Sequence, residues 1–232
     1  ADSACVDVIL VGDSVGMTVQ GRATTIPVSM DEMIYHARCV AAAEPAALVM
    51  VDMPFMSHAT VADALHNGAR MLKEGAAQIV KLEGGREQVD AVRRLAGAGV
   101  PVCAHLGLQP QSVHKLGGYR VQGRDAAAAQ AMVDDAEALA EAGADMILLE
   151  CVPAGLAARI TATVPVPVIG IGAGGATDGQ ILVLQDVLGI TPGKAPRFAR
   201  DFMAGQSDIH GAIAAYVDAV RARQFPQLEH CF

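Results

Sequence analysis

Short apolar runs alternate with longer amphipathic stretches along most of the chain. The runs are rich in Val, Ile and Leu, a composition typical of strands buried on both faces of a parallel sheet. Seven runs are predicted as strands, at residues 6–12, 47–52, 78–83, 100–107, 145–151, 167–174 and 181–186. Ala-rich stretches between them are predicted as helices, at residues 29–43, 60–75, 86–96 and 126–143.

Charged or imidazole side chains stand at the C-terminal end of one predicted strand after another. They are Asp13, Asp52, Glu83, His105 and Glu150. In an open doubly wound sheet, ligand contacts gather at the topological switch point, whereas every strand of a (β/α)8 barrel ends at one central site. The pattern therefore favours an α/β fold of the (β/α)8 TIM-barrel type over an open sheet.

The predicted strands number one fewer than the eight that a closed barrel requires. The chain begins with Ala-Asp-Ser-Ala-Cys, which resembles the tail of a helix, so we expect the first strand to be missing from this sequence. With 232 residues, 52% of them hydrophobic, the chain can bury one large core. We predict a single barrel domain over residues 1–232, N-terminally incomplete, with a C-terminal amphipathic helix at about 207–223.

The net charge and the cysteines indicate which kinds of partner the protein can have. A formal net charge of −8 with no cluster of Lys or Arg argues against nucleic acid and against an anionic membrane surface. No apolar run approaches the roughly 20 residues of a membrane-spanning helix, and no signal-peptide layout is present. The five cysteines are widely spaced without a Cys-x-x-Cys pair and are predicted to be reduced. We expect a cytoplasmic protein that acts on a small molecule.

Lys81 and Glu83 lie two residues apart on one predicted strand, so their side chains face the same way. A structural salt bridge is the simple alternative. Buried ion pairs contribute little to stability, however, so two charges on an otherwise apolar strand favour a functional role at the barrel mouth.

Asp13, Asp52 and Glu83 are predicted to meet at that mouth. Each Asp alone could be a helix N-cap. Three converging carboxylates repel one another unless a cation holds them, and a small set of oxygen ligands favours Mg²⁺ over zinc. Such an ion can bind a 2-oxo acid and stabilise an enolate as it forms.

Glu150 is the remaining candidate for a general base, because burial beside apolar neighbours raises a carboxyl pKa towards neutrality. His105 is predicted to hydrogen-bond the substrate or to orient another group. A purely structural role for this histidine is left open.

Residues 11–21, Val-Gly-Asp-Ser-Val-Gly-Met-Thr-Val-Gln-Gly, closely resemble the signature of the ketopantoate hydroxymethyltransferase family. Further blocks resemble the same family in the same order along essentially the whole chain. They are Asp52-Met-Pro-Phe, Val80-Lys-Leu-Glu-Gly-Gly, Ala104-His-Leu-Gly-Leu-Gln-Pro-Gln-Ser, Gly117-Gly-Tyr-Arg-Val-Gln-Gly-Arg, Leu149-Glu-Cys-Val-Pro, Gly170-Ile-Gly-Ala-Gly and the terminal Phe225-Pro with Glu229-His.

The resemblance implies that the chain transfers a hydroxymethyl group from 5,10-methylenetetrahydrofolate to 2-oxoisovalerate and gives 2-dehydropantoate. It implies Mg²⁺ bound by Asp13, Asp52 and Glu83, and Glu150 as proton acceptor. Substrate contacts are expected from Asp13, Ser14, Asp52 and Lys81, with His105 placed beside the substrate. It also implies a large homo-oligomer.

Two other functions compete with this expectation. Another Mg²⁺-dependent barrel, such as a class II aldolase or a relative of isocitrate lyase, would use the same three carboxylates. The Lys-x-Glu-Gly-Gly setting of Lys81 and the absence of a lyase-type cysteine loop argue against it. A non-catalytic barrel that only binds a 2-oxo acid is the second alternative, although every expected catalytic residue is present.

Overall fold

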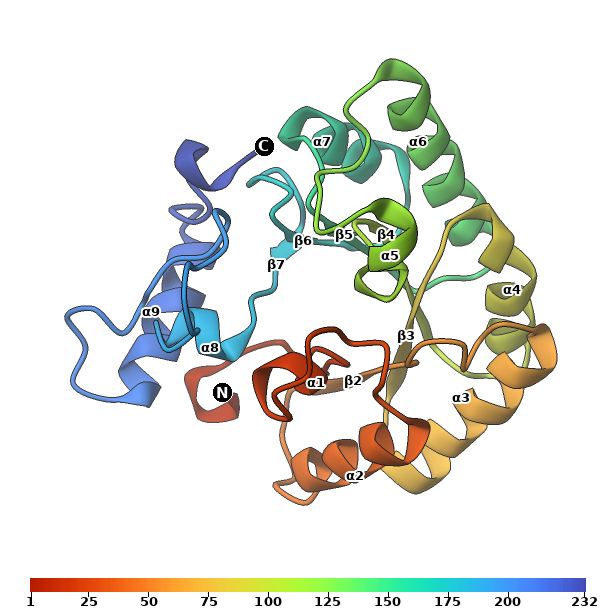
Figure 1. Cartoon of the computed structure of the whole chain (residues 1–232), viewed down its shortest axis with the longest axis horizontal. Coiled ribbons are helices and arrows are strands. Elements are labelled where there is room, and N and C mark those ends of the chain that lie inside the picture. The colour runs from red at the N-terminus through yellow and green to blue at the C-terminus, as the bar shows by residue number, and fades with distance from the viewer.

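Seven parallel strands form one curved sheet in the computed structural model, which describes residues 1–232. In sheet order they are β1 (Val8–Val11), β2 (Leu48–Asp52), β3 (Ile79–Glu83), β4 (Val102–Gly107), β5 (Met146–Glu150), β6 (Val168–Ile171) and β7 (Gly179–Gln180). Each strand pairs in parallel with the next one along the chain, so the sheet curls in one direction (Figure 1). β1 and β7 do not pair with each other, and the sheet is a half-barrel of the predicted (β/α)8 type.

Helices between the strands cover the outer face of this sheet (Figure 1). The helices are α1 (Val15–Thr18), α2 (Met30–Ala41), α3 (Val61–Gly75), α4 (Val89–Gly97), α5 (Val113–Leu116), α6 (Ala126–Glu141), α7 (Ala154–Thr163), α8 (Leu184–Val187) and α9 (Ile209–Arg221). α2, α3, α4, α6 and α7 pack side by side in that order. None of these helices is long and apolar enough to cross a membrane.

Polar side chains fix where several helices begin. Ser29 and Glu32 form a reciprocal capping box at the start of α2. Thr60, Asp125 and Asp208 each accept a hydrogen bond from a backbone N–H in the first turn of α3, α6 and α9. These residues satisfy N–H groups that the helix itself leaves unpaired. The four predicted helices are therefore confirmed, with ends shifted by a few residues.

Successive side chains of each strand point to opposite faces of the sheet, and each face forms its own buried layer. The side chains of one set point outwards and join the main core between sheet and helices, as Val51, Val80 and Leu149 do. The other set fills the inside of the curved sheet with a smaller cluster built on Met50, Ile79, Cys103, Leu148 and Ile171. Because side chains alternate with a period of two, the inward set continues to the strand ends, where it becomes polar.

Six of the seven predicted strands are confirmed, and the seventh is wrong. Residues 181–186 leave the sheet directly after the two-residue β7, and Leu184–Val187 forms helix α8. The run contains Asp186, whose Oδ1 accepts a hydrogen bond from Thr191 Oγ1. A short apolar run does not by itself distinguish a strand from a helix. The C-terminal helix predicted at 207–223 is confirmed as α9.

Candidate active site

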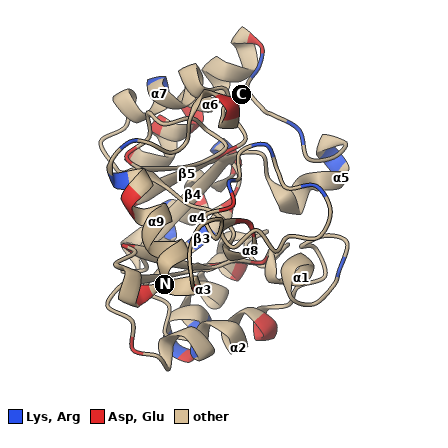
Figure 2. Cartoon of the chain, turned by 90° about the vertical axis from the view of Figure 1, so that its left-hand side faces the viewer, with Lys and Arg blue, Asp and Glu red and all other residues tan.

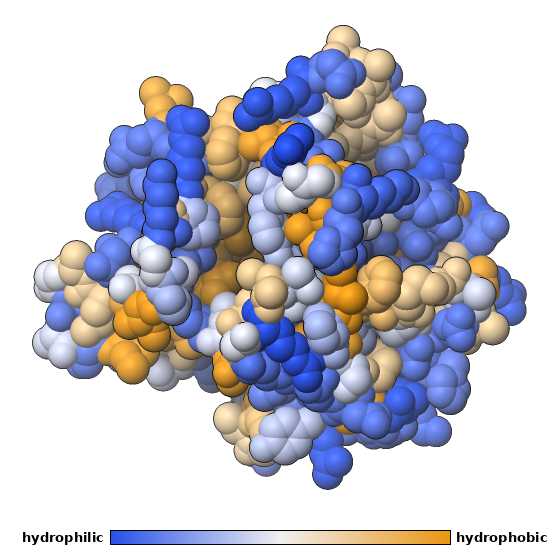
Figure 3. Space-filling model, in the orientation of Figure 1, coloured by the Kyte–Doolittle hydropathy of each residue, from blue (hydrophilic) through white to orange (hydrophobic).

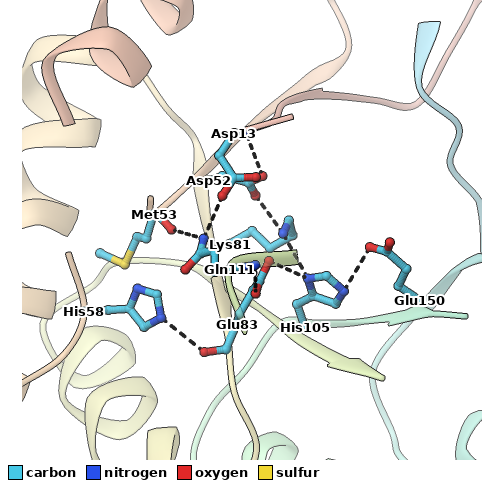
Figure 4. Close-up of polar contacts among 9 residues, drawn as sticks. All are labelled: Asp13, Asp52, Met53, His58, Lys81, Glu83, His105, Gln111 and Glu150. Carbon is cyan, nitrogen blue, oxygen red and sulfur yellow. Dashed lines mark hydrogen bonds and ion pairs between the residues drawn. The ribbon is translucent and has the colours of Figure 1, made fainter. Parts of the chain in front are cut away.

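The ends of β2, β3, β4 and β5 bring charged and imidazole side chains to one mouth of the half-barrel (Figure 4). The strand register places Asp52 beside Lys81 and Glu83 beside His105. Asp13 follows β1 by two residues and is 4% exposed. These residues are inward members of the strands or directly adjoin them, as the alternation predicts.

Asp13 and Asp52 form an adjacent pair. The backbone N–H of Asp13 donates to Asp52 Oδ2 at 3.0 Å. Lys81 Nζ lies 2.9 Å from Asp52 Oδ1, and both side chains are 5% exposed. Burial raises the pKa of Asp13, and the negative charge of Asp52 raises it further. Burial opposes the charged form of Lys81, but the carboxylates of Asp52, Glu83 and Asp13 together hold its pKa above the ordinary value.

A chain of polar contacts runs from Lys81 through His105 to Glu150 (Figure 4). Lys81 Nζ is 3.2 Å from His105 Nδ1, and His105 Nε2 is 3.4 Å from Glu150 Oε2. Burial and the nearby ammonium of Lys81 hold the pKa of His105 well below its usual range, so the ring is neutral. An ammonium only donates, so Nδ1 must accept and the single ring proton lies on Nε2, facing Glu150.

The backbone at the end of β4 packs closely against the backbone of Glu150. Gly107 pairs with Glu150 in the register and has φ +95°. A Cβ at this position would stand 2.2 Å from the carbonyl oxygen of Glu150, so only glycine fits. The N–H of Leu108 then donates to the same carbonyl oxygen at 2.8 Å. Burial raises the pKa of the Glu150 carboxyl to about 7, although Lys81 opposes the shift.

Gln111 connects the carboxylates and was not predicted from the sequence. Its side-chain Nε2 donates to Asp13 Oδ2 at 2.9 Å and to the carbonyl oxygen of Met53 at 2.8 Å. Its backbone N–H donates to Glu83 Oε2 at 3.1 Å. Burial raises the pKa of Glu83 well above its usual value, and this carboxyl also lies 3.7 Å from His105 Nδ1.

His58 is a second buried residue at the site that was not predicted from the sequence. Its Nε2 contacts the carbonyl oxygen of Glu83 at 3.1 Å, while its Nδ1 has no hydrogen-bond partner. A cavity of about 140 Å³ lies beside it, bordered by Glu83 and Gln111 and by the exposed side chains of Phe55 and Met56. No sequence motif marked this histidine.

The three predicted metal ligands are only partly brought together. Asp13 and Asp52 are adjacent, whereas Glu83 is held by Gln111, and no three His, Cys, Asp or Glu side chains form a ready metal site. Asp52 Oδ1 is buried without a hydrogen bond, and only Lys81 opposes its charge. The donors are hard carboxylate oxygens in an excess of negative charge, which fits Mg²⁺. Metal binding by Asp13, Asp52 and Glu83 stays a prediction.

Ser14, a predicted substrate contact, lies at the N-terminal end of α1 and is partly buried. Its side chain caps no backbone N–H, so the hydroxyl is free for another partner. A Cβ on Gly12 would lie 3.1 Å from this hydroxyl and 3.4 Å from Asp52 Oδ2. The hydroxyl therefore lies near the acidic pair.

Comparison with known proteins gives a consistent family. The model of the family described as ketopantoate hydroxymethyltransferase matches residues 1–228. A 3-methyl-2-oxobutanoate hydroxymethyltransferase of Alkalilimnicola ehrlichii is 65% identical over 231 residues, covering 100% of this chain and 83% of that protein. One of the same name from Halorhodospira halophila is 60% identical, covering 100% of this chain and 84% of that protein.

Solved structures agree on the fold. An oxaloacetate acetylhydrolase bound to 3,3-difluorooxalacetate aligns with a TM-score of 0.56 at 14% identity, covering 73% of this chain and 61% of that one. 2,3-Dimethylmalate lyase, described as a PEP mutase/isocitrate lyase superfamily member, aligns with a TM-score of 0.54 at 17% identity, covering 72% and 60%. At these identities the likeness concerns the fold alone.

Proposed function

This chain belongs to the ketopantoate hydroxymethyltransferase family, and from that premise we propose how it adds a hydroxymethyl group to 3-methyl-2-oxobutanoate, giving 2-dehydropantoate in pantothenate biosynthesis. The proposed one-carbon donor is 5,10-methylenetetrahydrofolate. One observation most supports a proton-abstraction mechanism. The side chains of Lys81, His105 and Glu150 lie in contact one after another, and the carboxyl of Glu150 has a pKa of about 7.

Substrate binding is assigned to the acidic pair and its neighbours. The ammonium of Lys81 and the hydroxyl of Ser14 can contact the carboxylate and oxo oxygens of the 2-oxo acid. Asp13, Asp52 and Glu83 would hold Mg²⁺, which supplies a Lewis acid that polarises the oxo group and stabilises negative charge on it. His105 is buried beside Lys81 and supports the position of the base.

Glu150 is the proposed general base. It takes the proton from C3 of the substrate, and the electron pair of that C–H bond moves towards the oxo oxygen to give an enolate. A base works best when its pKa is near the working pH, and the Glu150 carboxyl has a pKa of about 7. The Nε2–H of His105 faces Glu150 Oε2 at 3.4 Å.

Carbon-carbon bond formation completes the reaction. The methylene carbon of the donor is bonded to two folate nitrogens. C3 of the enolate attacks this carbon as its bond to the first nitrogen breaks, and the hydroxyl of water then replaces the second nitrogen. The two nitrogens take up the proton removed from C3 and the proton released by water, and tetrahydrofolate leaves. No oxidant or reductant is required.

An NMR experiment in D₂O tests the first half of this proposal. The C3 proton of 3-methyl-2-oxobutanoate is followed with the protein, first with Mg²⁺ and then with EDTA, before any folate is added. We expect exchange of this proton that depends on the metal, and then 2-dehydropantoate when 5,10-methylenetetrahydrofolate is supplied. A folded protein that bound the substrate without exchanging the proton would contradict the enolate mechanism and favour a binding protein.

The final addition of 5,10-methylenetetrahydrofolate distinguishes a hydroxymethyltransferase from an aldolase or a lyase. Turnover of an aldol substrate without any turnover of the folate donor would instead favour an aldolase or lyase. A cytoplasmic homo-oligomer with no nucleic-acid or membrane partner completes the proposal, and analytical ultracentrifugation measures the oligomeric state.

A further inference from the structure

One segment passes over the mouth of the half-barrel from the metal side to the base side. We call residues 113–124 the strap. Just before it, Gln111 is hydrogen-bonded to Asp13 and Glu83. Near its end, the N–H of Gln122 donates to the carbonyl oxygen of Cys151, the residue after Glu150, at 3.0 Å. The strap is therefore fixed at both ends to the candidate active site.

The middle of the strap also lies near the site. Tyr119 Oη donates to Met17 Sδ of α1 at 3.4 Å, so the strap touches the segment after β1. Burial raises the pKa of Tyr119, and the charges of Glu150, Asp13 and Glu83 add to the shift. The space-filling view shows this face of the molecule hollowed, with hydrophobic surface inside the hollow (Figure 3).

The charge of the strap differs from that of the rest of the chain. It carries three of the 17 Lys and Arg residues, Lys115, Arg120 and Arg124, and none of the 25 Asp and Glu residues. All three side chains are exposed, and none makes an ion pair. Figure 2 shows basic residues on α5 and its adjoining loop. An unpaired cationic rim on a chain of net charge −8 attracts an anionic ligand.

We propose that the strap binds the glutamyl tail of the folate donor through Lys115, Arg120 and Arg124. This inference rests on the proposed function. The donor carries its reactive methylene group at the pterin end and its carboxylates at the opposite end, on one or more γ-linked glutamates. The methylene carbon must reach into the mouth to meet the enolate, so the tail must leave the mouth at its rim. The strap supplies unpaired cations at that rim, and each added glutamate supplies one more carboxylate.

Isothermal titration calorimetry tests this proposal, because the chain contains no Trp to report binding by fluorescence. The probes are tetrahydrofolate with one glutamate and the same compound with three. The triglutamate carries two more carboxylates than the monoglutamate, and two additional exposed ion pairs predict about tenfold tighter binding, a preference that shrinks as salt screens the charges. The triple variant Lys115→Gln, Arg120→Gln, Arg124→Gln is expected to lose the preference.

A matched variant removes the same charge elsewhere. Arg38, Lys73 and Arg94 are exposed on α2, α3 and α4 and make no ion pairs, so their change to Gln should keep both the preference and the turnover. Thermal unfolding checks that each variant folds. If the strap variant unfolds, the single variant Arg120→Gln and the salt dependence of the unmutated protein give the answer.

Two results would overturn the proposal. One is equal affinity for the two tail lengths in the unmutated protein, and the other is a strap variant that keeps the preference. Failure of the proposed hydroxymethyltransferase function gives a different result, because the methylene donor would then not be turned over with either one or three glutamates. Binding of tri-γ-glutamate alone, without the pterin, shows whether the strap recognises the tail itself.

Discussion

At the scale of single residues, Lys81 decides what the neighbouring imidazole can do. Its ammonium faces His105 Nδ1 at 3.2 Å, which leaves Nε2 as the protonated nitrogen opposite Glu150. Nε2 forms no hydrogen bond in the structure, and because it already carries the ring proton it cannot itself remove a proton from the substrate. The assignment of the base to Glu150 follows from this geometry.

Glu150→Gln should bind 3-methyl-2-oxobutanoate but lose proton exchange at C3. An amide keeps the shape of the carboxyl but cannot accept the proton, so the exchange rate should fall by about 100-fold or more. NMR in D₂O measures the rate, and Glu137→Gln on the exposed side of α6 is the matched control. Undiminished exchange in the Glu150 variant would show that another group is the base.

Gln111→Ala should reduce the free energy of unfolding by about 2–3 kcal/mol. The change removes the two donors that satisfy Asp13 Oδ2 and the Met53 carbonyl, and it leaves both acceptors buried. Urea unfolding measures the difference. Gln130→Ala, at an exposed position of α6, should change the free energy by less than about 0.5 kcal/mol. Equal effects of the two changes would contradict a bridging role for Gln111.

The predicted carboxyl and histidine residues of the site were visible in the sequence because each is a polar side chain at the end of an apolar strand. Gln111 and His58 lie in loops, and their contacts with Asp13 and Glu83 depend on how the loops fold back over the strand ends. No spacing rule connects Gln111 to Asp13, which is 98 residues earlier. Partners of this kind follow from tertiary structure alone.

At the scale of elements, periodicity predicted the long helices and the buried strands but not the last strand. β7 contains only two residues, and the apolar run after it turns into α8. The strap was likewise missed as a basic feature, because Lys115, Arg120 and Arg124 are spaced too widely to form a cluster in the sequence. The absence of acidic residues around them was the available signal.

Thr60→Ala should destabilise the protein by about 1 kcal/mol through helix α3. Thr60 Oγ1 accepts from the N–H of Asp63 at 3.1 Å and donates to its carboxylate at 2.6 Å. In Thr163→Ala the lost hydroxyl contacts only the carbonyl oxygen of Arg159 in the last turn of α7, so little change is expected. Chemical denaturation of the two variants compares the losses, and a similar loss in both would argue against the capping role.

At the scale of the whole molecule, the fold places several carboxyl groups together in the buried mouth of the half-barrel. Four carboxyl groups share the mouth with one ammonium, and burial raises the pKa of Asp13, Glu83 and Glu150. For each of these groups the folded state holds its proton more tightly than the unfolded state. The metal-free protein should therefore become less stable as pH rises through their pKa values.

The contribution of Glu150 to this pH dependence can be isolated. Its pKa rises from the ordinary 4.5 to about 7. The unfolding free energy of the unmutated protein, relative to Glu150→Gln, should fall by up to about 3 kcal/mol as pH rises from 4.5 to above 7. Urea unfolding in EDTA at several pH values measures the difference. A difference that rose with pH would mean that the carboxyl is ionised and stabilised in the fold.

The fixed orientation of His105 also prevents the imidazole from carrying a proton away from Glu150. Nε2 already bears the ring proton, and Nδ1 faces an ammonium that cannot accept another proton. A proton captured by Glu150 therefore does not leave through His105, whereas the side chain is 17% exposed towards solvent. A donor seated over that exposed part would keep the proton in the mouth, available to the nitrogen that departs last.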